Sequence, residues 1–173
     1  MNFIKKNKLT YIIILTFILL VCSICTFFSY TKPLVINEIC TNNQTIISID
    51  DNCYYNWIEI YNPNNKSICL DDYYISNDKN ELNKFKFIRN VYLGAHDYIV
   101  VYFNEGYTGE NWLVASFNIN LNDKYIYLSN KKGKIVSQIE NVKLEPDTSY
   151  GYFDKKLQVL NPSPNKKNIF IEN

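Results

Sequence analysis

The sequence predicts an all-β domain preceded by one apolar N-terminal helix. Two observations on the 173-residue chain indicate this architecture. An uncharged stretch runs from Tyr11 to Tyr30, whereas from Pro33 onward short runs rich in Ile, Val, Tyr and Phe alternate with turn residues. No window beyond Pro33 shows sustained helical periodicity, which indicates an all-β region. About ten short strands at this spacing favour one β-sandwich over a parallel sheet.

The N-terminal helix is expected to anchor the chain in a membrane. The uncharged stretch has about the 20 residues that an α-helix needs to cross the hydrocarbon core. Lys5, Lys6 and Lys8 precede it, and by the positive-inside rule they place the N-terminus in the cytoplasm. We therefore expect a cytoplasmic segment at residues 1–9, a transmembrane signal-anchor helix at 10–30 and an extracellular domain at 31–173, with its core at about 34–168.

A cleaved signal peptide is the alternative reading of this segment. Ser23 and Cys25 are small enough to precede a cut before Thr26. The apolar run nevertheless continues through Phe27 and Phe28, beyond the roughly 7–15 residues that are usual in signal peptides. An uncleaved anchor is therefore favoured, and the N-terminus of the mature protein decides between the two.

Ten segments beyond Pro33 are expected to form strands, because they alternate or carry β-branched and aromatic residues. They are residues 33–40, 45–49, 55–62, 67–76, 84–88, 97–103, 113–119, 124–130, 133–141 and 148–153. The loop from Ser129 to Gly133 should join two of them as a hairpin, since Gly suits a positive φ. Ile58, Ile60, Ile99, Val101, Ile126 and Leu128 are expected on the buried faces.

Successive segments of the chain resemble the lamin-tail domain family. The segments are VINEI at 35–39, WIEIYNPNN at 57–65, ICLDDYYIS at 68–76, FKFIRNVYLGAHDYIVVY at 85–102, FNINLNDKYIYLSNKKGKIVSQI at 117–139 and DTSYGYFD at 147–154. The ending NPSPNKKN at 161–168 is similar to that of bacterial members, although it lacks their usual Gly near Asn165, and Tyr74 stands where the family often has Trp. The resemblance implies an immunoglobulin-like β-sandwich that acts as an interaction module, and it implies no reaction centre.

The charge of the outer region argues against nucleic acid as a partner. Four of the 18 basic residues precede Pro33, whereas all 17 acidic residues follow it, so the outer region has three more acidic than basic residues. It contains only isolated lysine pairs and no basic block. There is little electrostatic basis for binding a phosphate backbone.

Carboxylates are the strongest candidates for chemistry. Glu38 and Glu59 lie in predicted strands, and a small secreted or surface hydrolase using this pair is the alternative function. Residues 57–61 alternate, which places Glu59 opposite Ile58 and Ile60. We therefore expect Glu59 to be hydrated or paired with a lysine, with a pKa near or below its ordinary value.

Other candidate sites have weaker support. His96 is the only histidine and lies in a turn-like segment, so no imidazole-rich metal site is expected. Turn carboxylates could supply calcium ligands, but their spacing matches no EF-hand loop, and they are interpreted as turn formers: Asp50, Asp51, Asp71, Asp72 and Asp78. No phosphate-binding glycine motif is present.

The cysteines predict neither a metal nor a redox centre. Cys40, Cys53 and Cys69 permit at most one disulfide within the chain, and their redox state stays open. Cys22 and Cys25 lie in the apolar helix, with no second pair nearby.

The sequence thus predicts a single-pass, surface-exposed lamin-tail protein that is not an enzyme. We expect no catalytic, cofactor-binding or metal-binding residues and no cofactor. The expected partners are the membrane, through the N-terminal helix, and a protein or cell-envelope polymer.

Overall fold

The computed structural model describes residues 2–27, 31–49 and 52–171. The chain divides into two compact units, Met1–Lys32 and Pro33–Asn173. The first unit contains the helix α1 (Asn2–Phe27), whose side chains are described only in part. Among the described residues, we find no helix with both the length and the apolar character that a membrane crossing requires.

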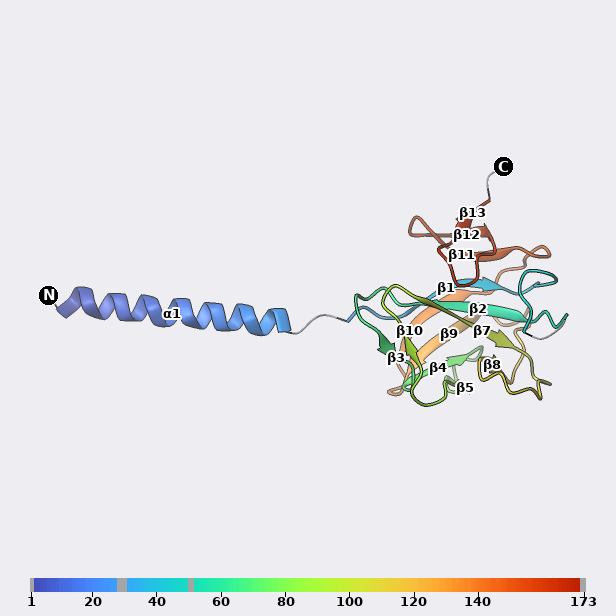
Figure 1. Ribbon diagram of the computed structural model, residues 1–173, viewed down its shortest axis with the longest axis horizontal. Helices are drawn as coiled ribbons and strands as arrows, with labels where there is room; N and C mark the ends of the chain where they lie inside the picture. The colour runs from blue at the N-terminus through green and yellow to red at the C-terminus, as the bar shows by residue number, and fades with distance from the viewer. Residues whose placement is uncertain (1, 28–30, 50–51, 172–173) are drawn as a thin grey trace. The chain divides into compact units, whose positions relative to one another are not determined.

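The described part of the second unit forms thirteen strands (Figure 1). They are β1 (Val35–Cys40), β2 (Asn56–Tyr61), β3 (Ile68–Cys69), β4 (Tyr73–Ser76), β5 (Phe85–Lys86), β6 (Tyr92–Leu93), β7 (Tyr98–Phe103), β8 (Val114–Ala115), β9 (Tyr125–Asn130), β10 (Ile135–Glu140), β11 (Ser149–Phe153), β12 (Lys156–Asn161) and β13 (Ile169–Phe170).

Two main sheets enclose the core. The larger has the order β13-β12-β11-β1-β2-β7-β8, and the smaller has the order β10-β9-β4-β5, while β3 and β6 form a separate pair. All strand pairs are antiparallel except β7 with β8. In Figure 1 the C-terminal strands β11 to β13, drawn in red, continue the larger sheet beyond β1.

Apolar residues of both sheets meet in one hydrophobic core. Ile58 and Ile60 of β2 and Val101 of β7 face Ile126 and Leu128 of β9, and all five are fully buried. The prediction of these core positions is confirmed, except that Ile99 is only partly buried. The backbone N–H of Ile36 also donates to the Ser137 hydroxyl of β10 at 2.9 Å, which ties the two sheets together.

A β-bulge in β1 determines which of its residues face outward. The pairing with β2 shifts between Ile36 and Glu38, so that Ile36 lies opposite Ile60 while Glu38 lies opposite Glu59. One extra residue in a strand reverses the alternation of faces beyond it. Ile36 and Ile39 therefore both enter the core, although they are three positions apart.

Several expected strands differ from those observed. Residues 45–49 form no strand, and the expected strand 67–76 is divided by a turn in which the Tyr73 N–H donates to the Leu70 carbonyl at 2.9 Å. The hairpin of β9 and β10 is confirmed, with Gly133 at φ 70°. Strands β6, β12 and β13 were not expected from the sequence.

Candidate functional site

Glu38 and Glu59 lie side by side on the outer face of the larger sheet. The two residues are directly opposite one another in the β1–β2 register, and the side chains of opposite residues point to the same face. The expectation that Glu59 lies on the face opposite Ile58 and Ile60 is thus confirmed. Both glutamates are nevertheless fully buried, with 0% of their surface exposed.

The C-terminal residues 161–168, here called the closing segment, hold the Glu38 carboxylate. The backbone N–H of Ser163 donates to Glu38 Oε1 at 3.1 Å, and its hydroxyl donates to Oε2 at 3.1 Å. The Ser149 hydroxyl of β11 also donates to Oε1. The Glu38 carboxylate therefore accepts hydrogen bonds from two different segments of the chain.

The same segment holds the Glu59 carboxylate. The backbone N–H of Asn165 donates to Glu59 Oε2 at 2.6 Å, and the Asn37 amide donates to Oε1 at 2.9 Å. The Lys166 N–H donates to the Ser163 carbonyl at 3.1 Å and also lowers the pKa of Glu59. Both carboxylates consequently act as acceptors for a chain segment that would otherwise leave buried N–H groups unpaired.

Two asparagines complete this buried network. Asn37 donates to Asn168 Oδ1 at 2.7 Å, and the Asn168 amide donates to the backbone carbonyls of Asn37 at 3.1 Å and Tyr152 at 2.9 Å. The network thus connects β1, β2, β11 and the closing segment. Its polar side chains are each paired, which is the condition under which buried polar groups rigidify a structure.

Two backbone features allow the closing segment to lie this close to the sheet. A Cβ atom on Gly151 would come within 2.5 Å of the Asn37 carbonyl oxygen and 2.9 Å of Asn168 Nδ2. Asn165 has φ 61°, in the left-handed region that Gly and Asn tolerate best. Asn165 therefore takes the conformation that the usual Gly of the family would permit.

The electrostatics contradict the prediction for Glu59. Burial, with a smaller contribution from the charge of Glu38, raises its pKa to about 8 despite the hydrogen bonds from Asn37, Asn165 and Lys166, which lower it. Burial also raises the pKa of Glu38, against hydrogen bonds from Ser149 and Ser163. Among the described residues, no cation forms an ion pair with either carboxylate. The expected hydration and ordinary pKa of Glu59 were wrong because the closing segment covers this face.

Enclosure restricts what the two carboxylates can do chemically. A raised pKa is one property of a general acid, but such a group must also reach its substrate. Glu38 and Glu59 are absent from the lining of the neighbouring cavity, which includes Asn37 and Asn168. The geometry therefore supports a structural role for both.

This neighbouring cavity, here called the tyrosine pocket, has a volume of about 260 Å³. Its lining comprises Asn37, Tyr61, Tyr98, Tyr152, Phe153, Asp154, Lys167 and Asn168. Tyr61 and Tyr98 are cross-strand neighbours whose rings stack with centroids 4.8 Å apart. The pocket therefore combines aromatic walls with amide side chains, an arrangement typical of small-ligand sites.

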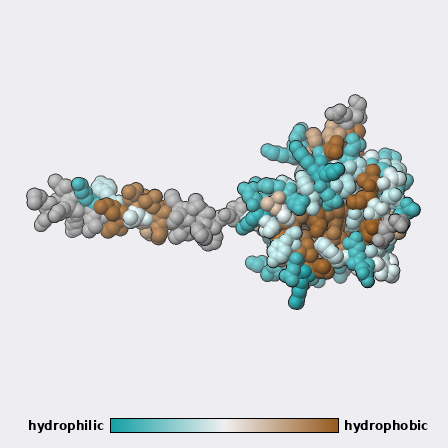
Figure 2. Space-filling view, in the orientation of Figure 1, coloured by the Kyte–Doolittle hydropathy of each residue, from teal (hydrophilic) through white to brown (hydrophobic). Residues whose placement is uncertain are grey.

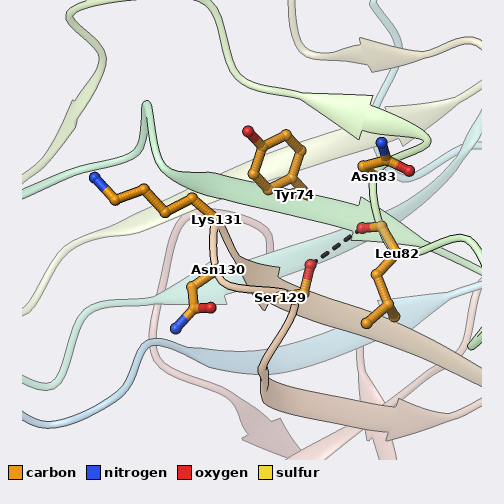
Figure 3. Close-up of a pocket in the computed structure, with 7 residues that line it drawn as sticks. Tyr74, Leu82, Asn83, Ser129, Asn130 and Lys131 are labelled. Atoms are coloured by element: carbon orange, nitrogen blue, oxygen red, sulfur yellow. Dashed lines mark hydrogen bonds between the residues drawn. The ribbon is translucent and has the colours of Figure 1, made fainter.

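A second cavity, of about 310 Å³, lies on the smaller sheet between Tyr74 and the β9–β10 turn (Figure 3). Its polar groups are largely engaged by the protein itself. The Ser129 hydroxyl donates to the Leu82 carbonyl at 3.1 Å, as Figure 3 shows, and Lys131 pairs with Asp72 at 2.6 Å. This cavity offers few groups that converge on a ligand.

His96 is exposed at the edge of the larger sheet. One ring nitrogen lies 3.2 Å from the Tyr61 hydroxyl, and the other lies 2.7 Å from the Asn65 side-chain oxygen. Its φ of 56° places it in a tight turn. No carboxylate or thiol joins it in a cluster of metal-ligating residues within the described part of the chain.

The turn carboxylates differ in their partners. Asp78 accepts from the Asn80 N–H at 2.8 Å, as expected of a turn former, whereas Asp71 accepts from the N–H of Asn90, 19 positions away, also at 2.8 Å. Asp72 forms the ion pair with Lys131. Asp50 and Asp51 lie outside the described residues.

The three cysteines of the domain are free, so no disulfide closes the described part of it. Cys40 is buried, and this burial raises the pKa of its thiol to about 12. Cys53 and Cys69 are half-buried. The side chains of Cys22 and Cys25 lie outside the described part of α1.

The polar partners of the carboxylates were not predicted from the sequence. Asn37, Ser149, Ser163 and Asn168 are buried polar residues whose neighbours come from distant parts of the chain. The three-residue spacing of Ile36 and Ile39 is the one local signal that could have indicated the bulge. No local pattern indicates which segment covers the outer face.

Comparison with known proteins supports the resemblance seen in the sequence. The model of the Lamin Tail Domain family matches residues 29–143, about two thirds of the chain. The match covers β1 to β10, including Glu38 and Glu59, and ends before β11 and the closing segment. A search of curated proteins finds no match. Since the family match covers more than half of the chain and includes strands of both main sheets, this chain belongs to the lamin tail domain family.

Proposed function

We propose that this chain is a non-catalytic binding module of the cell surface. The family supports an interaction role, since it is an immunoglobulin-like domain family that generally lacks catalysis. One observation carries the non-catalytic part of the proposal. Glu38 and Glu59, the best candidates for acid–base chemistry, are fully buried and bind the closing segment.

We propose further that α1 holds this module at the outer surface of a bacterial membrane. The support comes from the sequence, in which three lysines precede a long uncharged stretch. Among the side chains of α1 that the structure describes, the large apolar ones are exposed, including Leu15, Phe17 and Leu19. Figure 2 shows this apolar stretch in brown. A helix that is apolar on all sides requires an apolar environment.

Fractionation of cells that express the full chain tests this localisation. We expect the protein in the membrane fraction after alkaline extraction, with an N-terminus at or near Met1. Externally added protease should digest the domain in intact cells whose wall has been removed. A soluble protein that begins near Thr26 would contradict the anchor and indicate secretion.

Binding to envelope material tests the module itself. The full-length chain, purified in detergent and immobilised, is exposed separately to cell-wall polymers, detergent-solubilised membrane proteins and duplex DNA. We expect retention of one of the first two classes and little retention of DNA, because acidic residues predominate in the domain. The absence of binding to all three would remove the support for a binding role.

A hydrolase remains the second candidate because the pKa of Glu59 is raised to about 8, as in many general acids. A panel of chromogenic glycosides and esters, assayed with the full chain, decides between the two roles. Activity that both Glu38→Gln and Glu59→Gln abolish, in variants that remain folded, would establish the hydrolase. Activity that is absent, or that both variants retain, would exclude chemistry by this pair.

A further inference from the structure

Two cavities lie on either side of the turn between β11 and β12. The first is the tyrosine pocket, and the second, of about 360 Å³, is lined by Phe153, Asp154, Lys156, Gln158 and Phe170. Phe153 and Asp154 line both cavities. The two therefore form adjacent halves of one elongated site, as required for a chain-like ligand.

Aromatic rings form the walls of both halves. Tyr61 and Tyr98 stack in the first half, while Phe153 and Phe170 stack in the second with centroids 5.6 Å apart. Phe170 is 42% exposed, which is unusual for a phenylalanine that serves only to fill a core. Aromatic faces that remain accessible beside polar groups are typical of recognition sites.

The polar groups of the site are held in place before any ligand arrives. Asn37 donates its amide hydrogens to Glu59 and Asn168, which fixes the orientation of its side chain. Asn37 lines the tyrosine pocket, and an amide oxygen has two lone pairs with which it can accept a hydrogen bond from a ligand. A preorganised site loses less side-chain entropy on binding.

The turn that separates the two halves is similarly constrained. Asp154 and Lys155 both have positive φ, 47° and 66°, as in the tight turns that favour two-residue hairpins. The β11–β12 register extends to Phe153 and Lys156 on either side of this turn. The position of the Asp154 carboxylate between the two cavities therefore follows from the hairpin geometry.

The charges of the site favour a neutral ligand. Across both halves the charged lining residues are one acid, Asp154, and two bases, Lys156 and Lys167, so the net charge of the site is only +1 and does not select a strongly charged ligand. Each cavity lies near the lower end of the roughly 300–1,000 Å³ typical of small-molecule sites. One sugar ring suits such a volume, since its C–H face can stack on an aromatic ring while its hydroxyls pair with amides and carboxylates.

We propose that the paired cavities around Phe153 and Asp154 bind a neutral glycan chain, with one sugar ring in each cavity. This inference rests on the proposed binding function and specifies its ligand class. The aromatic side chains supply the stacking surfaces, and Asn37, Asp154 and Gln158 supply hydrogen bonds to hydroxyl groups.

Calorimetric titration of the full-length chain in detergent tests the proposal. The probes are the neutral hexasaccharides of glucose in β-1,4, β-1,3 and α-1,4 linkage, the β-1,4 hexamer of N-acetylglucosamine, and a proline-rich decapeptide. We expect at least one hexasaccharide to bind and the peptide not to bind. The monosaccharides should bind much more weakly, because they occupy only one cavity.

Three variants examine the two halves of the site. Tyr152→Ala and Phe170→Ala should each weaken hexasaccharide binding about tenfold or more, the effect of losing a contact worth about 1.4 kcal/mol. Asp154→Asn removes the charge and keeps a residue that tolerates positive φ, so it should weaken binding without altering the turn. Tyr92→Ala is the matched control, because Tyr92 is an exposed tyrosine of β6 that lines neither cavity.

The outcomes separate this inference from the proposed function. Binding of envelope polymers that is unchanged in all three variants would overturn the glycan site and leave the binding module intact. Binding of the proline-rich peptide in place of the hexasaccharides would also overturn it. Failure of both envelope material and hexasaccharides to bind would contradict the proposed function as well.

Discussion

The stability of the domain should fall as the pH rises from 5 to 9. Burial raises the pKa of Glu59 from 4.5 to about 8, and it also raises the pKa of Glu38. In this range the folded protein retains protons that the unfolded chain has released, so increasing pH favours unfolding. The stabilisation that comes from the raised pKa of Glu59 is fully present below about pH 4.5 and is lost as the pH rises through about 8.

The size of this loss follows from the shift of Glu59. Each unit of pKa difference corresponds to about 1.4 kcal/mol, so we expect a decrease of about 4 kcal/mol in unfolding free energy. Urea unfolding of the full chain in detergent, followed by the fluorescence of buried Trp57, measures it. Glu59→Gln should flatten most of the dependence, because it removes the titrating group. A wild-type stability that is constant or increases between pH 5 and 9 would refute the reasoning.

Six substitutions at five positions, all measured as changes in unfolding free energy, test other contacts. Ile60→Ala should cost about 2–5 kcal/mol, since Ile60 is fully buried, and a loss below about 0.5 kcal/mol would remove it from the core. Gly151→Ala should cost about 1–3 kcal/mol because its Cβ would meet the Asn37 carbonyl, whereas Gly106→Ala, where the nearest atom lies 3.7 Å away, should be nearly neutral. Equal costs for Gly151→Ala and Gly106→Ala would contradict the close approach of the Asn37 carbonyl to Gly151. Because Asn165 has φ 61°, Asn165→Gly should be tolerated, whereas Asn165→Val should cost about 1–2 kcal/mol. Equal losses of stability in these two variants would exclude backbone strain at this position. Glu59→Gln at pH 6 should cost about 1–3 kcal/mol, because one acceptor oxygen becomes a donor that faces an N–H group. Finding that variant as stable as the wild type would indicate that Glu59 is not the acceptor for Asn165.

The sandwich and its core could be predicted because their signals are local. The alternation in residues 57–61 correctly placed Ile58 and Ile60 in the core, and Gly133 correctly marked the β9–β10 hairpin. Strand β12 was missed because its turn, Asp154-Lys155, takes positive φ without the Asn or Gly that usually signals it. Local patterns thus predicted local structure wherever the turn chemistry was conventional.

The environment of Glu59 could not be predicted, because it depends on contacts between distant segments. Alternation gives the face of a strand, but it does not show what covers that face. Asn165, which bonds Glu59, is 106 positions away in the sequence. The burial of both carboxylates therefore required the tertiary structure.

The tyrosine pocket could not be predicted for a similar reason. Tyr61, Tyr98 and Tyr152 come from three strands, and each residue alone is explained by the β propensity of tyrosine. Only the sheet order places β11 close enough to β2 and β7 for these rings to surround one cavity. Composition showed that the domain is rich in tyrosine without showing where the rings gather.

Hydrogen exchange at the backbone amides of Ser163 and Asn165 tests most directly whether the buried carboxylates hold the closing segment. Both N–H groups donate to Glu38 or Glu59 in a segment that lies outside regular secondary structure. At pH 6 we expect slow exchange at both amides in the wild type. Glu59→Gln should accelerate exchange at Asn165 while amides of the central strand β2 stay protected. Rapid exchange of both amides in the wild type would contradict the account, because it would show that the carboxylates are free of the closing segment and open to solvent.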